Sequence, residues 1–325
     1  MKKNKKVYIY GLCNVYYDSF YIQGLREIFH DIEFNISRFP NFVQGTFAVI
    51  LLQNGFETKI IIDSRDTNEI DLLSFNWCNK YGKVNYNYAT IPVDPLNKVI
   101  AVGPSFGIKI WSFSKTMYFA LTNLIKYRSK ISNNREFIAN YWRQYKRMPI
   151  KLYHPKKSSY ANVFFIGSIW KNEKITNNFR ALFIESCLKN KEIKFIGGFA
   201  PRNDGNNLGL ESLVYCKKIA LKEYLPSIQN SAFAFNTPAV LSCHGWKLAG
   251  FLALGKAIIS TEHKNVMPAL LKDNVHLLYV ADAEDIKMKI AILLSDSDLK
   301  SRLEKNSRSY FEEHLAPSVI VSKLL

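Results

Sequence analysis

The feature that most constrains the fold of this chain is the stretch 233–260. Its first part, FAFNTPAV at Phe233–Val240, is typical of a buried strand that ends in a turn. Apolar residues at helical spacing follow a glycine turn, Gly255 closes that helix, and Ala257–Ser260 has the pattern of a second strand. An open parallel sheet uses this order to bind a phosphate group at the start of the helix. We therefore expect a phosphate-bearing ligand to bind here.

The start of this helix supplies four candidate ligand-binding residues, His244, Gly245, Trp246 and Lys247. Gly245 lets a ligand approach the backbone N–H groups, and Lys247 adds positive charge. His244 can bond a hydroxyl or a phosphate oxygen. Each also has a structural interpretation, as a solvated lysine, a capping histidine or a core tryptophan.

Other strand ends add candidates, because loops at the carboxyl ends of parallel strands share one edge of the sheet. Lysine and arginine suit contacts with phosphate, and arginine can make them bidentate. The alternative is a set of surface cations and glycine turns. The candidates are Gly167, Ser168, Lys171, Gly197, Arg202, Thr237 and Pro238.

The chain of 325 residues is long enough for two domains with separate cores. Residues 148–159 carry two prolines and a basic, serine-containing tail, which indicates a linker. We place one domain at 1–157 and the other at 158–325. Strands that alternate with helices predict the α/β class, with parallel sheets in both halves.

The pattern of apolar residues predicts strands and helices in both halves of the chain. In the first half, strands are expected at 7–12, 47–52, 59–62, 98–102 and 108–113, and helices at 21–29, 71–81 and over most of 112–147. In the second half, strands are expected at 163–166, 193–196, 232–236, 257–260 and 276–280, and helices at 177–190, 221–230, 244–255, 284–294 and 298–314.

The charge and the cysteines indicate the cellular compartment and the kind of partner. Five dispersed cysteines argue for a reducing compartment and against a zinc site. The apolar part of the N-terminus is too short for a signal peptide, and no apolar run approaches roughly 18 residues, so we expect a cytoplasmic protein without a membrane span. The net charge of +17 needs an anionic partner.

An anionic membrane surface fits this charge better than nucleic acid, because the cations are dispersed and no nucleic-acid-binding motif is present. The densest cluster, Tyr141–Met148, interleaves aromatic residues with cations, as interfacial helices do. Its alternative interpretation is an ordinary solvated helix face. The sequence therefore favours a peripheral contact with the inner membrane face.

The C-terminal half resembles the donor-binding domain of GT-B glycosyltransferases, in particular the group 1 family. The matching pieces are Phe233–Val240, LALGKAIIST at Leu252–Thr261, NVHLLYV at Asn274–Val280 and the closing helix, within 162–315. The resemblance implies two Rossmann-like domains facing each other across a cleft, with the last helix returning towards the N-terminal domain.

The same resemblance implies the reaction. A sugar would pass from a nucleotide-sugar, which is a substrate and not a cofactor, to a glycan or lipid-linked glycan in surface polysaccharide assembly. Backbone N–H groups and basic side chains would hold the diphosphate without a metal ion. If the anomeric centre is inverted, a base is needed, and Asp18 and Asp63 in the N-terminal half are the candidates. Retaining enzymes of this fold lack an obvious base, so the stereochemistry stays open.

One departure from the family concerns its two glutamates in the pattern E-x7-E. Ser242 and Gly250 stand at these positions, which places the contacts with the donor's hydroxyls in doubt. Three alternatives therefore stay open. They are a GT-B nucleotide-sugar epimerase, a catalytically degraded protein that binds a nucleotide or glycan, and a protein whose main task is polyanion binding.

Overall fold

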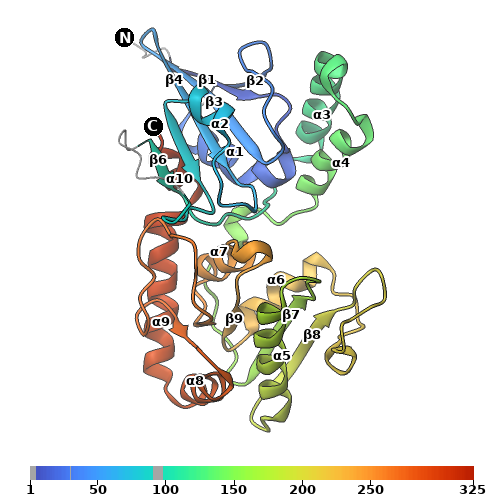
Figure 1. The fold of residues 1–325 in the computed structure, drawn as a ribbon, viewed down its shortest axis with the longest axis vertical. Helices are drawn as coiled ribbons and strands as arrows, with labels where there is room; N and C mark the ends of the chain where they lie inside the picture. Colours follow the sequence, from blue (N-terminus) through green and yellow to red (C-terminus); the bar gives the residue numbers. More distant parts are fainter. Residues whose placement is uncertain (1–4, 30, 91–97) are drawn as a thin grey trace. The chain divides into compact units, whose positions relative to one another are not determined.

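The computed structural model describes residues 5–29, 31–90 and 98–325, and it divides the chain into two compact units (Figure 1). Unit 1 comprises the residues up to Leu152 together with Asn265–Ala269 and Glu313–Leu325. Unit 2 comprises Tyr153–Lys264 and Leu270–Glu312. The chain therefore changes from one unit to the other more than once.

Unit 1 is a six-stranded sheet with helices. Its strands are β1 (Lys5–Tyr10), β2 (Ile32–Asn35), β3 (Thr46–Gln53), β4 (Phe56–Asp63), β5 (Lys80–Lys83) and β6 (Val99–Ala101), in the spatial order β2-β1-β3-β4-β5-β6. Its helices are α1 (Val15–Ile28), α2 (Leu72–Trp77), α3 (Phe113–Tyr127), α4 (Asn134–Tyr145) and α10 (Pro317–Ser322).

The expectation of a parallel sheet in the first half is confirmed for three of the five strand pairings and wrong for the other two, because β3 runs antiparallel to both β1 and β4. The cause is a tight hairpin between β3 and β4. Asn54 and Gly55 both have positive φ, 54° and 81°, as the two central residues of a type I′ turn do. This turn reverses the chain within two residues, so no crossover helix separates the strands. The Asn-Gly pair was the available signal in the sequence.

Two other expected elements of the first half are also wrong. Residues 108–113 form no strand, because the Ile108 N–H donates to Ser19 Oγ (2.9 Å) and the Ile108 carbonyl accepts from Gln144 Nε2 (3.2 Å). This apolar run is buried by α1 and α4 instead of by strand pairing. The helix expected at 71–81 ends at Trp77, since the residues after it pair as β5 with β4 and β6.

The end of the chain packs on unit 1 through a close approach of α10 to α1 (Figure 1). A Cβ placed on Gly24 in α1 would lie 2.2 Å from the Pro317 carbonyl oxygen at the start of α10. Only glycine therefore allows the two helices to meet at this distance.

Unit 2 contains parallel strands only, among the residues that the structure describes. Its strands are β7 (Asn162–Ser168), β8 (Lys194–Ala200), β9 (Ala234–Asn236), β10 (Ile258–Ser260) and β11 (Leu278–Tyr279). Its helices are α5 (Lys174–Lys189), α6 (Leu221–Asn230), α7 (Trp246–Ala253), α8 (Ala283–Ser295) and α9 (Ser297–Tyr310).

The strands of unit 2 form two ladders, β7-β8 and β9-β10-β11, which meet at β7 and β9. The Ala232 N–H before β9 donates to the Asn162 carbonyl in β7 (2.6 Å). The Phe164 N–H donates to Ser231 Oγ (3.0 Å). With α5 to α9 added, this is the α/β architecture that the strand–helix alternation predicts. It also places the carboxyl ends of several strands at one edge.

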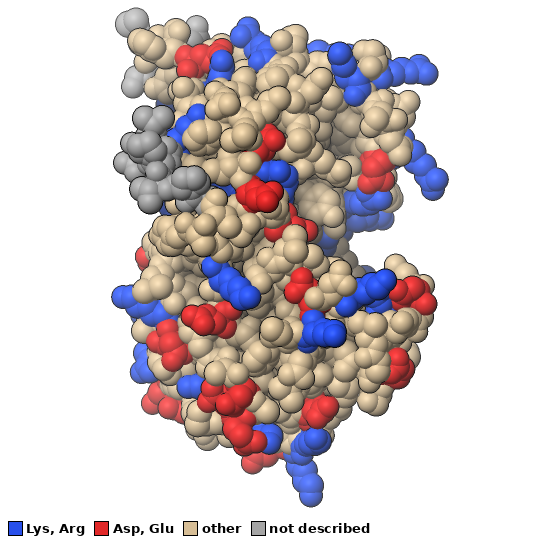
Figure 2. All heavy atoms as spheres, in the orientation of Figure 1, with Lys and Arg blue, Asp and Glu red and all other residues tan. Residues whose placement is uncertain are grey.

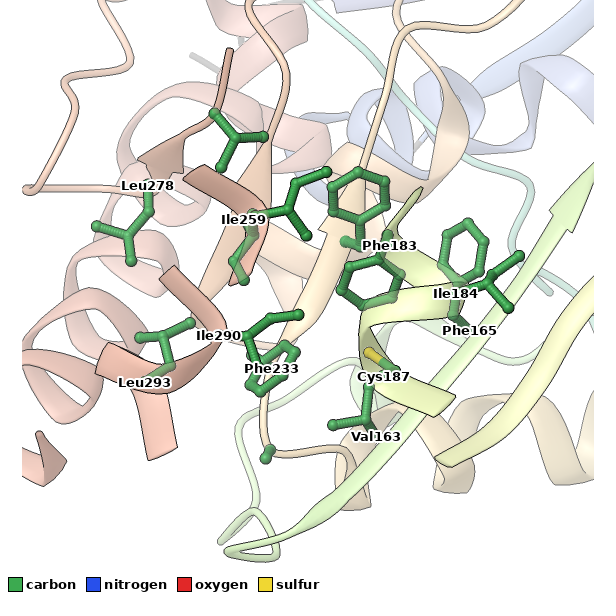
Figure 3. Packing of buried hydrophobic residues seen from close by; sticks show 14 of the residues in the cluster. Val163, Phe165, Phe183, Ile184, Cys187, Phe233, Ile259, Leu278, Ile290 and Leu293 are labelled. Atoms are coloured by element: carbon green, nitrogen blue, oxygen red, sulfur yellow. The ribbon is translucent and has the colours of Figure 1, made fainter. Parts of the chain in front are cut away.

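The core of unit 2 depends on aromatic packing between α5 and the strands (Figure 3). The Phe183 ring of α5 is fully buried and stacks on Phe235 of β9, with centroids 4.2 Å apart and an interplanar angle of 3°. Phe165 of β7 meets Phe183 edge-on at 5.4 Å. These contacts hold α5 against both ladders, so the residues at its N-terminal end keep a fixed position beside the strand ends.

Replacing Phe183 with alanine should lower the free energy of unfolding of unit 2 by about 3–5 kcal/mol, because the lost apolar contacts leave a cavity. Leu188→Ala is a matched control on the same helix, since Leu188 is exposed, and it should change the value by about 0.5 kcal/mol or less. Urea denaturation followed by circular dichroism measures both. Equal effects of the two variants would contradict this account of the core.

Candidate functional site

A pocket of about 630 Å³ opens at the carboxyl edge of the unit 2 strands. Pro238 follows β9, Thr261 and Glu262 follow β10, and Val280 follows β11. The N-terminal part of α5 closes another side. Loops at this edge are where open parallel sheets bind ligands.

The pocket wall is rich in polar side chains, and three of them are carboxylates. The polar lining consists of Glu173, Thr176, Ser242, Thr261, Glu262, Lys264, Tyr279 and Asp285. Carboxylates accept hydrogen bonds from sugar or ribose hydroxyls, and side-chain hydroxyls both accept and donate them. The wall therefore suits a ligand with several hydroxyl groups.

Glu173 also holds the loop before α7. Its Oε1 accepts a hydrogen bond from the Leu241 N–H (2.8 Å). Leu241 and Ser242 both have left-handed backbone, with φ of 54° and 59°. This conformation raises the conformational free energy of a non-glycine residue, and such strained residues are frequent at functional sites. Because Ser242 lines the pocket, the strained turn forms part of its wall.

The strand ends are tied together by Arg180 of α5, whose residue is only 6% exposed. Its Nε donates to Thr237 Oγ1 (2.9 Å), and one terminal nitrogen donates to the Ser168 carbonyl (2.7 Å). The other terminal nitrogen lies 3.4 Å from the Pro238 carbonyl oxygen. One guanidinium therefore joins the carboxyl ends of β7 and β9 beside the pocket.

A second cation lies close to Arg180. Lys247 in the first turn of α7 is half-buried, and its ammonium points inward, where it donates to the Ile166 carbonyl and lies 4.9 Å from the centre of the Phe165 ring. Burial, and then the charge of Arg180, lower the pKa of Lys247 to about 7. Burial lowers the pKa of Arg180 to about 10.

Neither cation forms an ion pair with a carboxylate of the described residues. Glu173 raises the pKa of Arg180 but makes no salt bridge with it. Buried charges in proteins are normally paired, because desolvation is costly. Both side chains also keep N–H donors beyond those used in the bonds above. Two neighbouring cations without a counter-ion indicate a position for an anionic ligand.

The other predicted residues at the start of α7 have different environments. Gly245 is the residue that precedes the helix, and a Cβ there would make only ordinary contacts, the nearest with Ala239 Cβ at 3.9 Å. His244 is buried, with its ring centre 5.8 Å from that of His263. Trp246 is half-buried in the first turn. None of these three residues lines the pocket, nor does Lys247, so anion binding at the start of α7 stays a prediction.

His263 is a site residue that the sequence did not single out. Its Nε2 lies 3.1 Å from Asn236 Nδ2, and its Nδ1 lies 3.1 Å from the Tyr279 hydroxyl. Burial, and then the charge of His244, lower its pKa to about 3. The imidazole is therefore neutral and acts here as a hydrogen-bonding bridge between the ends of β9 and β11.

The predicted glycines of β7 and β8 serve packing. A Cβ on Gly197 would lie 1.8 Å from the Phe165 carbonyl oxygen, and the φ of Gly197 is 138°. A Cβ on Gly167 would lie 3.3 Å from Arg180 Cδ, so this glycine makes room for the buried arginine. Neither lines the pocket.

The remaining predicted residues of unit 2 fall into two groups. Pro238 lines the pocket, and Thr237 and Ser168 bind Arg180. Lys171 is exposed in a turn. Arg202 forms an ion pair with Asp204 and donates to the Ile169 carbonyl (3.0 Å). The structure therefore gathers three of these residues around Arg180, and Lys171 and Arg202 lie outside the pocket lining.

Ser242 and Gly250, which stand where the group 1 family carries its two glutamates, also differ in whether they line the pocket. Ser242 lines the pocket, whereas a Cβ on Gly250 in α7 would meet nothing within 4 Å. The absent carboxylates thus leave Ser242 at the wall and open space at Gly250. Glu173 and Glu262, which the sequence analysis missed, place carboxylates on the same wall.

In unit 1, Asp63 at the end of β4 is fully buried and fully engaged. It accepts from Tyr81 Oη (2.6 Å) and Lys83 Nζ (2.9 Å), and it forms a bidentate pair with Arg65 (3.0 and 2.7 Å). Burial alone would raise its pKa, but the Arg65 hydrogen bonds and the Lys83 charge lower it. A carboxylate held in this way is a weak base.

Asp18, the other predicted base, lies in the first turn of α1 and is 2% exposed. Its Oδ1 is buried and has no hydrogen-bond partner. Burial raises the pKa of Asp18 to about 8. The carboxyl group is therefore protonated at neutral pH and titrates near the pH at which acid–base catalysis is efficient.

A membrane span and a metal site would each need a particular arrangement of the described residues. None of the helices there is both long and apolar enough to cross a bilayer. No group of three His, Cys, Asp or Glu side chains in the same residues is arranged to hold a metal ion.

No protein-family model matches this chain, and no curated protein matches it in sequence. Among solved structures it is similar to the C-terminal domain of a group 1 family glycosyl transferase, LpcC, from Francisella tularensis, with 16% identity, 50% of this chain and 95% of that one covered, and a TM-score of 0.36. It is also similar to a glycosyltransferase from Rickettsia africae, with 12% identity, coverage of 79% and 66%, and a TM-score of 0.44.

A third similar structure is HepE from Anabaena, solved in complex with UDP-glucose, with 14% identity, coverage of 64% and 66%, and a TM-score of 0.39. The chain spans about two thirds of the length of HepE and of the Rickettsia protein. The assignment of site residues rests on the geometry of this chain alone.

The buried carboxyl group of Asp18 should make stability depend on pH. The folded protein keeps this proton up to about pH 8, whereas an unfolded chain releases it near pH 4, so stability falls as pH rises through this interval, by up to about 1.4 kcal/mol per pH unit. Asp18→Asn removes this dependence. Urea denaturation at several pH values should show the variant gaining on the parent between pH 5 and pH 8. A constant difference would contradict a buried, protonated carboxyl group.

Proposed function

We propose that this protein is a glycosyltransferase that binds a nucleotide-sugar at the carboxyl edge of unit 2. The reaction class comes from the resemblance of 233–280 to group 1 donor-binding domains. The observation that carries the proposal is the pair of inward-pointing cations, Arg180 and Lys247, which form no ion pair with a carboxylate of the described residues and lie behind the strand ends that edge a polar pocket.

The cation pair supports binding of a diphosphate. A nucleotide-sugar carries its negative charge between two groups rich in hydroxyls, and that charge grows on the leaving diphosphate as the glycosidic bond breaks. Fixed cations in a site of low dielectric stabilise such charge strongly. In this proposal the two side chains supply the countercharge, so transfer needs no metal ion.

The pocket wall supports binding of the hydroxyl groups. Glu173 and Glu262 lie where they would accept hydrogen bonds from the ribose or the sugar, a task that the family gives to the glutamates absent here at Ser242 and Gly250. Carboxylates bind vicinal hydroxyls well because each oxygen accepts more than one hydrogen bond. The donor site would thus be divergent and still functional.

The acceptor is proposed to be a glycan or lipid-linked glycan of a surface polysaccharide. Of the two candidate bases, Asp18 fits better, because its Oδ1 has no hydrogen-bond partner among the described residues, whereas Asp63 is occupied by three partners. If the anomeric centre is inverted, the ionised form of Asp18, which predominates above about pH 8, would take the proton of the acceptor hydroxyl. A retaining reaction would not need it.

Lys247→Met tests the cation pair. We expect nucleotide binding to weaken by about 1–3 kcal/mol, the range for a hydrogen bond to a charged group. The free variant should be at least as stable as the parent at pH 7, because methionine removes an inward-pointing charge without a counter-ion. Calorimetric titration with UDP, GDP and their sugars measures affinity, and thermal melting measures stability.

Lys189→Met is the matched control, since Lys189 is an exposed lysine of α5 that pairs only with Glu185 and should leave binding unchanged. A parent that binds none of these nucleotides would overturn the proposal. Unchanged binding by Lys247→Met would place the anion elsewhere. Binding without turnover of the donor, in a hydrolysis assay, would instead favour the degraded binding protein.

A further inference from the structure

Helix α3 of unit 1 exposes a stripe of apolar side chains. Tyr118, Leu121 and Ile125 recur at helical spacing and are 63%, 49% and 77% exposed. The opposite face packs inward through Thr116, Ala120, Asn123 and Tyr127. A helix on the surface of a globular protein normally turns polar residues outward, so the exposed apolar residues of α3 are unusual. The stripe needs an apolar or amphipathic partner.

Cations surround the stripe. Of the residues between 112 and 152, nine are Lys or Arg, and Glu136 is the one acidic residue. Lys115, Lys126 and Arg128 are exposed on α3 or at its end, although Lys126 also lies 3.9 Å from Glu33 in an exposed ion pair. Figure 2 shows Lys and Arg side chains standing out from the part of unit 1 where Figure 1 places α3 and α4, with little acidic surface among them. The partner must therefore also be anionic.

Two aromatic rings lie beside the N-terminal end of α3, about a third of a turn around the helix from the stripe. Phe113 is 51% exposed and lies edge-on to Trp142 of α4, with ring centres 6.5 Å apart. The Lys146 ammonium lies 4.4 Å from the centre of the Trp142 ring. Aromatic rings capped by lysine are typical of the membrane interface. From Phe113 to Ile125 the exposed apolar residues extend over about 18 Å of helix.

We propose that α3 docks unit 1 on the surface of an anionic lipid bilayer, with Tyr118, Leu121 and Ile125 inserted at the interface and the cations at the headgroups. An interfacial helix needs both features at once, an apolar face and a cationic border. Nucleic acid would use the cations and leave Leu121 and Ile125 without a role. A second copy of this chain would bring like charges together.

This assignment differs from the one made on the sequence, which centred on α4. Two of the three cations named there are engaged within the protein. Arg143 pairs with Glu136 on the same helix, and Arg147 donates to the Tyr16 hydroxyl. Helix α4 therefore contributes Trp142 and Lys146 to an interface whose main element is α3.

Co-sedimentation of the full chain with vesicles tests this proposal. The parent should bind vesicles of phosphatidylcholine with phosphatidylglycerol, bind pure phosphatidylcholine at least tenfold more weakly, and lose affinity in high salt. The variant Tyr118→Ser/Leu121→Ser/Ile125→Ser should lose at least tenfold in partitioning to the anionic vesicles. All three side chains are exposed, so its melting temperature should match that of the parent.

Two further variants make the result decisive. Phe56→Ser/Leu72→Ser/Leu270→Ser removes three apolar side chains elsewhere that are 78%, 71% and 74% exposed, and it should bind like the parent. Lys115→Gln/Lys126→Gln/Arg128→Gln should also reduce binding at least tenfold. The proposal is overturned if the parent ignores anionic vesicles, or if the α3 stripe variant binds as the parent does. No nucleotide takes part in this measurement, so its failure would leave the donor-site proposal untouched.

Discussion

The unit 2 site depends on the buried guanidinium of Arg180. It bonds to the ends of two strands, β7 through the Ser168 carbonyl and β9 through Thr237, and so holds the pocket edge in place. Its position is set by the aromatic packing of α5 and by the space that Gly167 leaves free. Burying this charge costs free energy, and no carboxylate in the described part of the chain offsets it by direct pairing. A site that stores uncompensated charge in this way is prepared for an anion.

In unit 1, the buried charge of Asp63 is paired within the protein. The Asp63 carboxylate at the end of β4 is neutralised by Arg65 and Lys83 and hydrogen-bonded by Tyr81. This network is closed, so it stabilises the strand ends and leaves little capacity for a ligand. Arg180 and Lys247, by contrast, form no ion pair with a carboxylate of the described residues, and this difference is the reason that we propose them, and not the Asp63 cluster, as the anion-binding pair. Among the described residues of unit 1, three buried side-chain oxygens have no hydrogen-bond partner, and Asp18 Oδ1 is the one that belongs to a carboxyl group.

The sequence predicted the elements that depend on local patterns and missed the features that depend on contacts between distant residues. Helices and strands of 233–260 were found because their periodicity and closing glycine are local signals. The run 108–113 misled, because an apolar segment buried by α1 and α4 has the same pattern as a buried strand. Lys247 was found at the helix start, but its inward direction was not. The partners of a side chain depend on residues far away in the chain.

The sequence by itself determined the α/β class, the strand–helix alternation and the region of the site, since propensity and period act over a few residues. Only the tertiary structure decided which side chains meet. Arg180 reaches Thr237 across 57 positions of the chain, and the apolar residues of α3 face outward because its other face is taken by the core. Burial and charge compensation are properties of assembled surfaces. No window of sequence contains them, and the function proposed for this protein rests on both.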